Sequence, residues 1–434
     1  MTGISLPRPR RGPVDGAVEV PGSKSIVNRV LVVAALADGD SVLTGMPDGD
    51  DTVAMLACLH GLGVTTERLD DGPPGVLVAG RGGALTSGAT LHAGLAGTTS
   101  RFVTAMAALA SGPVIIDGHQ PLRDRPMAEL HGALRALGVH LEYHEREGHL
   151  PVTVTGPLRS GGHVALRGDV SSQFITALML IGPMLERGLS IALTTPLVSV
   201  PYVRLTAAVM ADFGVTDVAV DERRIVVPPG RYRGRPYHVE PDASSASYPL
   251  AIAALRGGSV SVPGLTAASL QGDIAVLELL GRMGCDVVGD DSGTTVRRDP
   301  ARPLLGIDVD MADISDLVPT IAAVAVTAST PTTIRGVGFI RAKESDRLGD
   351  LATGLRKTGA AVDVTDDGLH ITPVAELHGA TLSTHDDHRL AMAFAVLGAA
   401  VDGIVVEDPG VVSKSWPGFW DAYDALLAGN PEPD

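Results

Sequence analysis

The sequence predicts an α/β protein built from six copies of one structural unit of about 70–75 residues. Two series of repeated segments carry this prediction. In the first series a helix-like segment ends in glycine and a strand-like run follows, as in LRALGV and MADFGV. A fixed period of this kind is typical of repeated supersecondary units. The closing glycines recur at spacings of 70 to 76 residues, at Gly63, Gly138, Gly214, Gly284, Gly359 and, more weakly, Gly429.

The second series consists of apolar, alanine-rich segments that each open with small polar or charged residues. Five of the six end in glycine, as expected for a left-handed C-terminal cap. Short alternating runs such as 41–45, 114–118 and 259–264 come next and predict strands. Helices this apolar are expected to be buried on most faces. The six segments span residues 23–39, 96–112, 171–188, 244–258, 315–329 and 386–403.

Each unit is therefore predicted to contain a strand, a helix, a strand, a helix and one or two further strands. Six units are compatible with one solenoid or with two domains of pseudo-threefold symmetry, and the repeat alone does not choose between them. A long polar stretch, residues 221–242, follows the third unit. It predicts a hinge between the two halves of the chain.

Composition favours a soluble protein of the cytoplasm. The net charge of −16 argues against binding to nucleic acid or to an anionic membrane. The N-terminus resembles no secretory signal, and the longest apolar runs, near residues 174–183 and 317–328, are shorter than a membrane span of about 20 residues. Cys58 and Cys285 match no metal or redox spacing, and the histidines lack metal-ligand spacing, so no metal site is expected.

Cations recur at the predicted helix starts, where they oppose the positive end of the helix dipole. Only four lysines stand against 30 arginines, and three of them, Lys24, Lys343 and Lys414, are among the candidate site residues below. Unpaired N–H groups at several helix starts would form a site for an anion with phosphate and carboxylate groups. For Ser171 and Ser172 alone, capping remains the simpler explanation, and His388 is equally compatible with a structural hydrogen bond. The cations are Lys24, Arg101, Arg125, Arg347, Arg389 and Lys414.

Eight motifs, in order along nearly the whole chain, resemble the shikimate-pathway enolpyruvyl transferase family, 5-enolpyruvylshikimate-3-phosphate synthase. They are PGSKSIVNR (21–29), LAGTTSRF (95–102), PLRDRPM (121–127), GDVSSQFITALML (168–180), PDASSASYPLA (241–251), SLQGD (269–273), RAKESDRL (341–348) and DDHRLAMAFA (386–395). The resemblance implies an inside-out α/β barrel fold. Its two domains each hold three βαβαββ units with buried helices, and span residues 23–241 and residues 1–22 with 242–434.

The resemblance also implies the two substrates, shikimate 3-phosphate and phosphoenolpyruvate, and their binding residues in this sequence. Gln173 and Lys24 would contact both substrates. The shikimate 3-phosphate site would comprise Lys24, Ser25, Arg29, Thr98, Ser171, Ser172, Gln173, Ser199, Tyr202, Asp316 and Lys343. The phosphoenolpyruvate site would comprise Lys24, Gly97, Arg125, Gln173, Arg347, Arg389 and Lys414. Arginine forks suit both phosphate and carboxylate groups.

The implied reaction is addition of the 5-hydroxyl group to phosphoenolpyruvate, followed by elimination of phosphate from a tetrahedral intermediate. It needs a base at the hydroxyl group and an acid at the methylene carbon. We expect Asp316 to be the base, with help from Lys343, and Glu344 to be the acid, with Lys24 completing the catalytic set. No cofactor is expected, and we expect a monomer.

Two positions depart from the family pattern. Leu95 stands where asparagine is frequent, and Phe339 stands where many relatives carry a polar residue that can contact shikimate 3-phosphate. Neither position is part of the expected catalytic set, so the departures bear on the shape of the site and not on the reaction. The response to the inhibitor glyphosate is not predicted from them.

Three alternatives compete with this interpretation. The first is the sister enzyme, which uses UDP-N-acetylglucosamine as acceptor and usually carries a reactive cysteine in one loop and a Lys-Asn pair near the N-terminus. In this chain the corresponding loop, residues 117–126, contains no cysteine, and Lys24 is followed by Ser25, so this alternative is disfavoured. A non-catalytic phosphate-binding protein would not need Asp316, Glu344 and Lys24 together. A repeat scaffold for protein partners would not need cations at helix starts.

Overall fold

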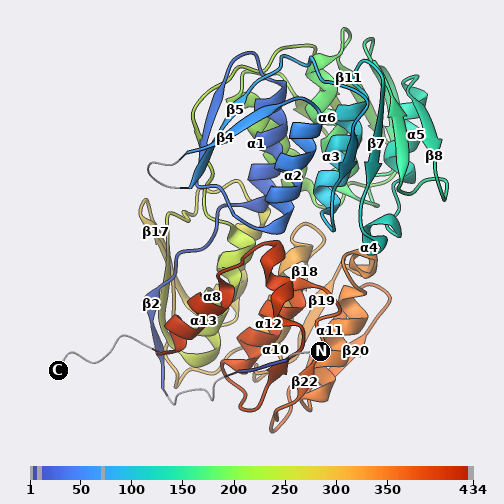
Figure 1. Ribbon diagram of the computed structural model, residues 1–434. Helices are drawn as coiled ribbons and strands as arrows, with labels where there is room; N and C mark the ends of the chain where they lie inside the picture. The colour runs from blue at the N-terminus through green and yellow to red at the C-terminus, as the bar shows by residue number, and fades with distance from the viewer. Residues whose placement is uncertain (1–2, 7–11, 70–73, 429–434) are drawn as a thin grey trace. The chain divides into compact units, whose positions relative to one another are not determined.

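The computed structural model describes residues 3–6, 12–69 and 74–428, and the chain forms two compact units (Figure 1). The first unit comprises residues 1–21 and 240–434, and the second comprises residues 22–239. The chain therefore passes between the units twice. Gly429, the last of the predicted closing glycines, lies outside the described residues.

The second unit contains three four-stranded sheets of the same topology. In each sheet the first strand pairs in parallel with the second, and the other pairings are antiparallel. The sheet orders are β14(Tyr237–His238)-β3(Ser41–Thr44)-β5(Gly75–Ala79)-β4(Thr65–Arg68), β6(Thr90–His92)-β7(Pro113–Asp117)-β9(Val152–Thr155)-β8(His140–Tyr143) and β10(Gly162–Leu166)-β11(Leu189–Leu193)-β13(Arg224–Val227)-β12(Ala219–Val220).

Three apolar helices of the second unit form its interior, as the sequence predicts. Every residue of α1 from Ile26 to Leu36 is buried, and the core is built almost entirely from aliphatic side chains. Burial on all faces explains why these segments lack the polar stripe of a surface helix. The interior helices are α1(Lys24–Leu36), α3(Gly97–Ala107) and α6(Ser172–Ile181), and the others are α2(Asp50–Gly61), α4(Gln120–Arg123), α5(Ala128–Ala136) and α7(Val200–Asp212).

The first unit repeats this plan with strands from both ends of the chain. Val14 pairs in parallel with Gly258, and Ile4 pairs with Val406 in an antiparallel register. The sheet orders are β16(Asp286–Asp290)-β17(Gly293–Arg298)-β15(Gly258–Pro263)-β2(Val14–Ala17), β18(Asp308–Asp310)-β19(Thr332–Arg335)-β21(Leu369–Thr372)-β20(Ala361–Val364) and β1(Ile4–Ser5)-β23(Val405–Val406)-β22(Thr381–Leu382).

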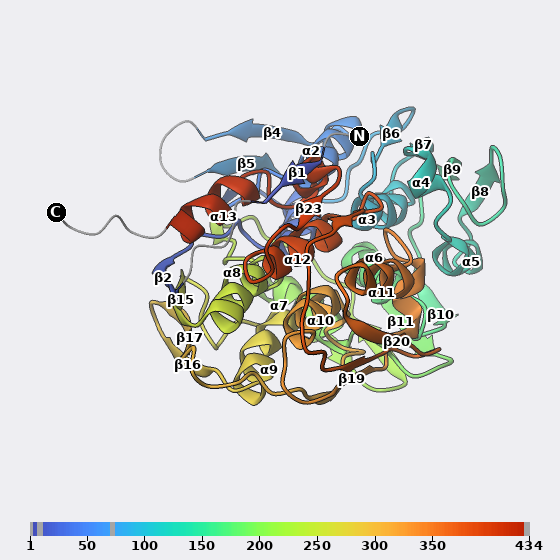
Figure 2. The ribbon, with the colours of Figure 1, turned by 90° about the horizontal axis from the view of Figure 1, so that it is seen from below.

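Helices α8(Ala243–Arg256), α10(Val318–Ala325) and α12(His388–Gly398) lie inside the first unit, surrounded by its three sheets (Figure 2). Their described side chains belong to one core cluster. Three further helices complete the unit: α9(Val276–Arg282), α11(Arg347–Lys357) and α13(Phe419–Ala428). The six repeats thus divide three and three, and the predicted α/β class is confirmed.

Residues 221–242, predicted as a hinge, belong almost entirely to the second unit. Strands β13 and β14 lie within this stretch and complete two sheets of the second unit. The passage to the first unit is confined to the neighbourhood of Val239 and Glu240. The sequence did not reveal these strands, because the stretch is rich in charged residues and prolines. Each strand also carries exposed side chains, so polar residues are tolerated there.

Candidate active site

Asp316 lies between two guanidinium groups in the first unit. The short 3₁₀ turn Ser315–Leu317 places its side chain at the start of α10. Its Oδ1 accepts a hydrogen bond from Arg347 Nη1 at 2.9 Å, and its Oδ2 accepts one from Arg389 Nη2 at 2.7 Å. Lys343 Nζ is 3.7 Å from Oδ1. The predicted base is therefore held in place by three of the predicted cations.

Arg347, the first residue of α11, is the centre of this network. Its side chain is 1% exposed, and all three guanidinium nitrogens donate hydrogen bonds to carboxylates. The partners are Asp316, Glu344 at 2.5 Å and Asp387 at 2.8 Å. Burial alone would lower the pKa of Arg347, but Asp387, Glu344 and Asp316 outweigh it and raise the pKa above its ordinary value. Arg347 is thus a fixed cation that orients the acidic groups.

Glu344, the predicted proton donor, bridges two cations. Its Oε2 accepts from Arg347, and its Oε1 accepts from Lys414 Nζ at 3.4 Å. Lys414 ends the 3₁₀ segment Pro409–Lys414, and its side chain is 8% exposed. Although 70 residues apart in sequence, Glu344 and Lys414 contact each other.

Lys343 is the most exposed cation of the cluster, with 30% of its side chain accessible. Its Nζ lies 5.9 Å from the centre of the Phe339 ring, which gives a cation–π contact. Burial lowers the pKa of Lys343, and Asp316 opposes this effect. The unusual Phe339 thus contacts a predicted catalytic residue.

The pKa of Asp316 lies well below its usual range. Burial by itself would raise the pKa, but Arg389, Lys343 and Arg347 together reverse this effect. The carboxyl group is therefore ionised throughout the physiological pH range. It can accept a proton readily only when other anions offset the surrounding cations.

The second unit carries the other predicted residues, and Lys24 and Arg29 lie on α1. Lys24 Nζ is 3.3 Å from Asp51 Oδ2 at the start of α2. Arg29 is 3% exposed and donates to Thr206 Oγ1 and to the carbonyl oxygens of Ser25 and Tyr202. Burial lowers the pKa of Arg29 to about 10. Among the residues that the structure describes, no carboxylate forms a salt bridge with Arg29, so an anionic ligand would stabilise its charge.

Gly97 lies directly against two guanidinium groups. A Cβ atom at this position would be 2.6 Å from Arg101 Nη1 and 2.9 Å from Arg125 Nη1. Arg101 also donates to Gln173 Oε1 at 2.6 Å and stacks over the Phe174 ring. The first turns of α3 and α6 are therefore joined through Arg101. A side chain at this position would shift the ends of these two flexible arginines.

The remaining predicted residues lie at helix starts of the second unit. Ser171 caps α6 by accepting from Gln173 N at 3.3 Å, which confirms the capping explanation for this serine. Ser172 is the first residue of α6 and is buried, and Thr98 lies in the first turn of α3. Ser199, buried and with φ of 58°, precedes α7, where Tyr202 lies beside Arg29.

The network around Arg347 in the first unit and the predicted residues at the helix starts of the second unit form two clusters. Several residues of these two clusters were not among the predicted site residues. Asp387 caps α12 and holds Arg347, while Asp51 holds Lys24. Both are acids that follow an acidic neighbour in the sequence, Asp386 and Asp50, and the pattern gives no sign of which of the two points inward. Arg101 is a cation at a predicted helix start, but the expected binding and catalytic sets do not include it. The side chain of His388 is buried, and its Nδ1 lies 3.6 Å from Asp387 Oδ1.

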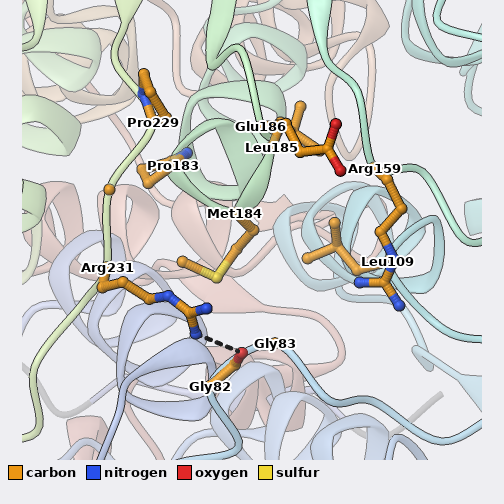
Figure 3. A pocket seen from close by; sticks show the side chains of 11 residues that line it. Gly82, Gly83, Leu109, Arg159, Pro183, Met184, Leu185, Glu186, Pro229 and Arg231 are labelled. Carbon is orange, nitrogen blue, oxygen red and sulfur yellow. Dashed lines mark hydrogen bonds between the residues drawn. The ribbon is translucent and has the colours of Figure 1, made fainter.

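A pocket of about 450 Å³ lies elsewhere in the second unit. Leu109, Met184 and Leu185 line it, and Arg159 and Arg231 lie on opposite sides (Figure 3). The pocket adjoins the segments at the C-terminal ends of the interior helices, where positive charge complements the helix dipole. No predicted site residue lines it.

Comparison with known proteins identifies the family. The family model for EPSP synthase (3-phosphoshikimate 1-carboxyvinyltransferase) matches residues 9–423. The chain belongs to this family. A 3-phosphoshikimate 1-carboxyvinyltransferase of Trichormus variabilis is 41% identical over 98% of this chain and 100% of its own length. One of Methanoculleus marisnigri is 44% identical over 95% of this chain and 96% of its own length.

Solved structures of the EPSP synthase family have the same fold. EPSP synthase from Acinetobacter baumannii aligns with a TM-score of 0.81 and 26% identity over 97% of each chain. Family membership makes this chain an enolpyruvyl transferase of the shikimate route to aromatic amino acids. It does not support the alternative with UDP-N-acetylglucosamine as acceptor.

The described part of the chain contains neither a candidate metal cluster nor a candidate membrane-spanning helix. No group of three His, Cys, Asp or Glu side chains within it has an arrangement suited to a metal ion. None of its helices combines the length and apolar character that a membrane crossing requires.

Proposed function

We propose that the two clusters described above carry out the family's reaction, the transfer of the enolpyruvyl group of phosphoenolpyruvate to the 5-hydroxyl group of shikimate 3-phosphate. The observation that carries this proposal is the arrangement in the first unit. Two carboxylates, Asp316 and Glu344, share the cation Arg347, and each contacts a further cation. Such a site offers an acid, a base and anion-binding groups together.

The proposed binding residues form two sets, one for each substrate. Shikimate 3-phosphate is bound by Lys24, Ser25, Arg29, Thr98, Ser171, Ser172, Gln173, Ser199 and Tyr202, with Asp316 and Lys343 at its 5-hydroxyl group. Phosphoenolpyruvate is bound by Lys24, Gly97, Arg125, Gln173, Arg347, Arg389 and Lys414. Arg29, which forms no salt bridge with a described carboxylate, and the guanidinium groups around Gly97 support these roles, because buried cations favour anionic partners.

In the addition step, Asp316 accepts the proton of the 5-hydroxyl group while the hydroxyl oxygen forms a bond to C2 of phosphoenolpyruvate. Glu344 gives a proton to C3, which becomes a methyl group, and a tetrahedral intermediate results. The phosphate and carboxylate groups of the substrates offset Arg389, Lys343 and Arg347, which raises the pKa of Asp316 toward a useful value.

In the elimination step, the bond between C2 and the phosphate oxygen breaks and phosphate leaves. One proton of the methyl group returns to Glu344, the departing phosphate takes up the proton held by Asp316, and the enol double bond is restored. Lys24 and Lys414 balance the negative charge on the departing phosphate group. Each atom and charge introduced in the first step is accounted for in the products.

An assay of phosphate release tests this proposal. The purified chain is mixed with phosphoenolpyruvate and either shikimate 3-phosphate or UDP-N-acetylglucosamine. We expect phosphate only with shikimate 3-phosphate, together with a new enol ether signal in the proton NMR spectrum. Release with the nucleotide sugar alone, or with neither acceptor, would refute the proposal.

We further propose that the enzyme acts as a monomer in the cytoplasm. The two cysteines, Cys58 and Cys285, are buried, unpaired and lie in different units, as suits a reducing compartment. Sedimentation equilibrium at micromolar concentration should give a mass near 44.6 kDa. A mass of twice this value would exclude the monomer.

A further inference from the structure

Asp273 is a buried carboxylate next to the acid–base cluster that has no role in the mechanism above. It lies in the 3₁₀ turn Gly272–Ala275, ahead of α9, and is 3% exposed. A carboxylate this deeply buried is costly unless its neighbours compensate for the lost hydration.

A single hydroxyl group connects Asp273 to the predicted substrate-binding cations. Ser244, in the first turn of α8, donates from its Oγ to Asp273 Oδ2 in a short hydrogen bond. The same Oγ lies 3.5 Å from Arg389 Nη2. Arg389 Nη2 in turn donates to Asp316 at 2.7 Å. A chain of contacts thus runs from Asp273 through Ser244 and Arg389 to the predicted base.

The charges around Asp273 are unevenly distributed. Asp316 and Asp242 face it as acids, whereas Arg389 is the cation and Ser244 the hydrogen-bond donor that favour its ionised form. Burial, followed by the charge of Asp316, raises the pKa of Asp273 to about 6. Arg389 therefore lies between two carboxylates that compete for it, one ionised at all relevant pH values and one that titrates just below neutrality.

We propose that Asp273 is a positioning residue of the transfer reaction, which acts through Ser244 to hold the Arg389 guanidinium group beside Asp316. Asp273 touches neither substrate. Its ionised form fixes the Nη2 end of Arg389, so that the rest of the guanidinium group is presented to the carboxylate or phosphate group of phosphoenolpyruvate. The inference rests on the proposed function, in which Arg389 binds that substrate.

Two variants and one matched control test the inference. Asp273→Asn keeps the shape and an acceptor for Ser244 but removes the charge, and Ser244→Ala breaks the connection. Ser247→Ala is the control, because Ser247 is also a buried serine of α8 but bonds to the Ser244 carbonyl group and to Thr320. We expect kcat/KM for phosphoenolpyruvate to fall about tenfold in both test variants, as for loss of a hydrogen bond to a charged group. The control should stay within about twofold of the parent chain.

The pH profile separates positioning from a merely structural effect. The parent chain should lose kcat/KM as the pH falls through about 6, the pKa of Asp273. Asp273→Asn should lack this step and resemble the parent chain at low pH, whereas Ser247→Ala should keep it. Thermal unfolding checks that each variant is folded, and if Asp273→Asn does not fold, Ser244→Ala decides.

The outcomes distinguish the inference from the proposed function. If the parent chain releases no phosphate with shikimate 3-phosphate, the proposed function fails. If the parent chain is active but Ser244→Ala and Asp273→Asn match Ser247→Ala in kcat/KM and in pH profile, the positioning role of Asp273 is overturned.

Discussion

The chemistry of Asp316 is set by its neighbours more than by its own side chain. An isolated aspartate is a weak base with a pKa near 4, and here Arg389, Lys343 and Arg347 depress that value further. The three cations also fix the direction of both carboxylate oxygens. At the residue scale, then, the site is arranged to hold an ionised carboxylate until anionic substrates arrive.

Replacement of Asp316 should separate binding from turnover. We expect Asp316→Ala to lower kcat by a factor of about 10²–10⁴, the usual range for a lost general base, while shikimate 3-phosphate binding changes only a few-fold. Phosphate release measures the first quantity, and isothermal titration calorimetry measures the second. Asp313→Ala, at an exposed position in the turn just before Ser315–Leu317, is the control. Near-normal turnover of Asp316→Ala would rule out its role as the base.

The ring of Phe339 should support the charge of Lys343. Removal of a partly exposed cation–π contact costs roughly 0.5–1 kcal/mol, so Phe339→Leu should lower kcat/KM about two- to fivefold. Phe339→Tyr keeps the ring and should behave as the parent chain does. Steady-state kinetics with shikimate 3-phosphate as the varied substrate provides the measurement. Equal kcat/KM values for Phe339→Leu and the parent chain would contradict a role of the ring in supporting Lys343.

The sequence predicted residues of the network around Arg347 that stand in one motif and also others, such as Arg389 and Lys414, that lie far along the chain. Lys343, Glu344 and Arg347 stand within five residues, so their meeting needs only a local turn. The partners Asp387 and Asp51 were not predicted, because each follows a second aspartate, Asp386 or Asp50, and the pattern does not show which of the two points inward. That choice depends on packing between helices, which leaves no periodic trace in the chain.

At the scale of the element, the alanine-rich repeat predicted where the interior helices lie but not where they end. The predicted segment 171–188 contains α6, which stops at Ile181, and a 3₁₀ turn at Gly182–Met184 follows. Pro183 removes a backbone donor at that point. The apolar pattern continues beyond the helix because the turn is buried too, so hydrophobicity alone could not mark the boundary.

Helix α5 contains a buried histidine whose ionisation should destabilise the fold. His131 is 0% exposed, and neither ring nitrogen forms a hydrogen bond with a described residue. Burial, with smaller contributions from Arg135 and His149, lowers its pKa from 6.5 to about 4. Between these values the unfolded chain binds more protons than the folded chain, so the free energy of unfolding falls as the pH is lowered.

The size of this effect can be measured with His131→Leu. For the parent chain, linkage predicts a loss of about 2 kcal/mol in unfolding free energy between pH 7 and pH 5 from this residue alone. The variant should lack this loss, whereas the control His140→Leu, at an exposed position of β8, should retain it. Urea unfolding at the two pH values gives the comparison. Identical pH dependence in the parent chain and His131→Leu would contradict the assignment.

At the scale of the whole molecule, the two units have separate hydrophobic cores. The buried aliphatic residues fall into two clusters whose members divide between the units. The second unit is also a single continuous stretch, residues 22–239, with all strands of its three sheets inside it. A domain with its own core and complete sheets is expected to fold by itself.

A chain limited to residues 22–239 should therefore unfold cooperatively. If the proposed binding roles hold, it should also bind shikimate 3-phosphate, more weakly than the full chain because Asp316 and Lys343 are missing, and release no phosphate. Circular dichroism and calorimetry measure these properties, with Lys24→Ala in the same fragment as the binding control. A fragment that aggregates or melts without a transition would show that this unit depends on the rest of the chain.

The strand pairing of the first unit bears on how the protein is made. Strand β2 emerges from the ribosome early but must wait for β15, and β1 must wait for β23 at residues 405–406. The intervening unit can close once β14 has been synthesised. N-terminal residues 3–6 and 12–21 therefore remain unpaired while more than 200 later residues are translated. The nascent chain accordingly exposes its first strands longest, and these are the segments that a chaperone would need to shield.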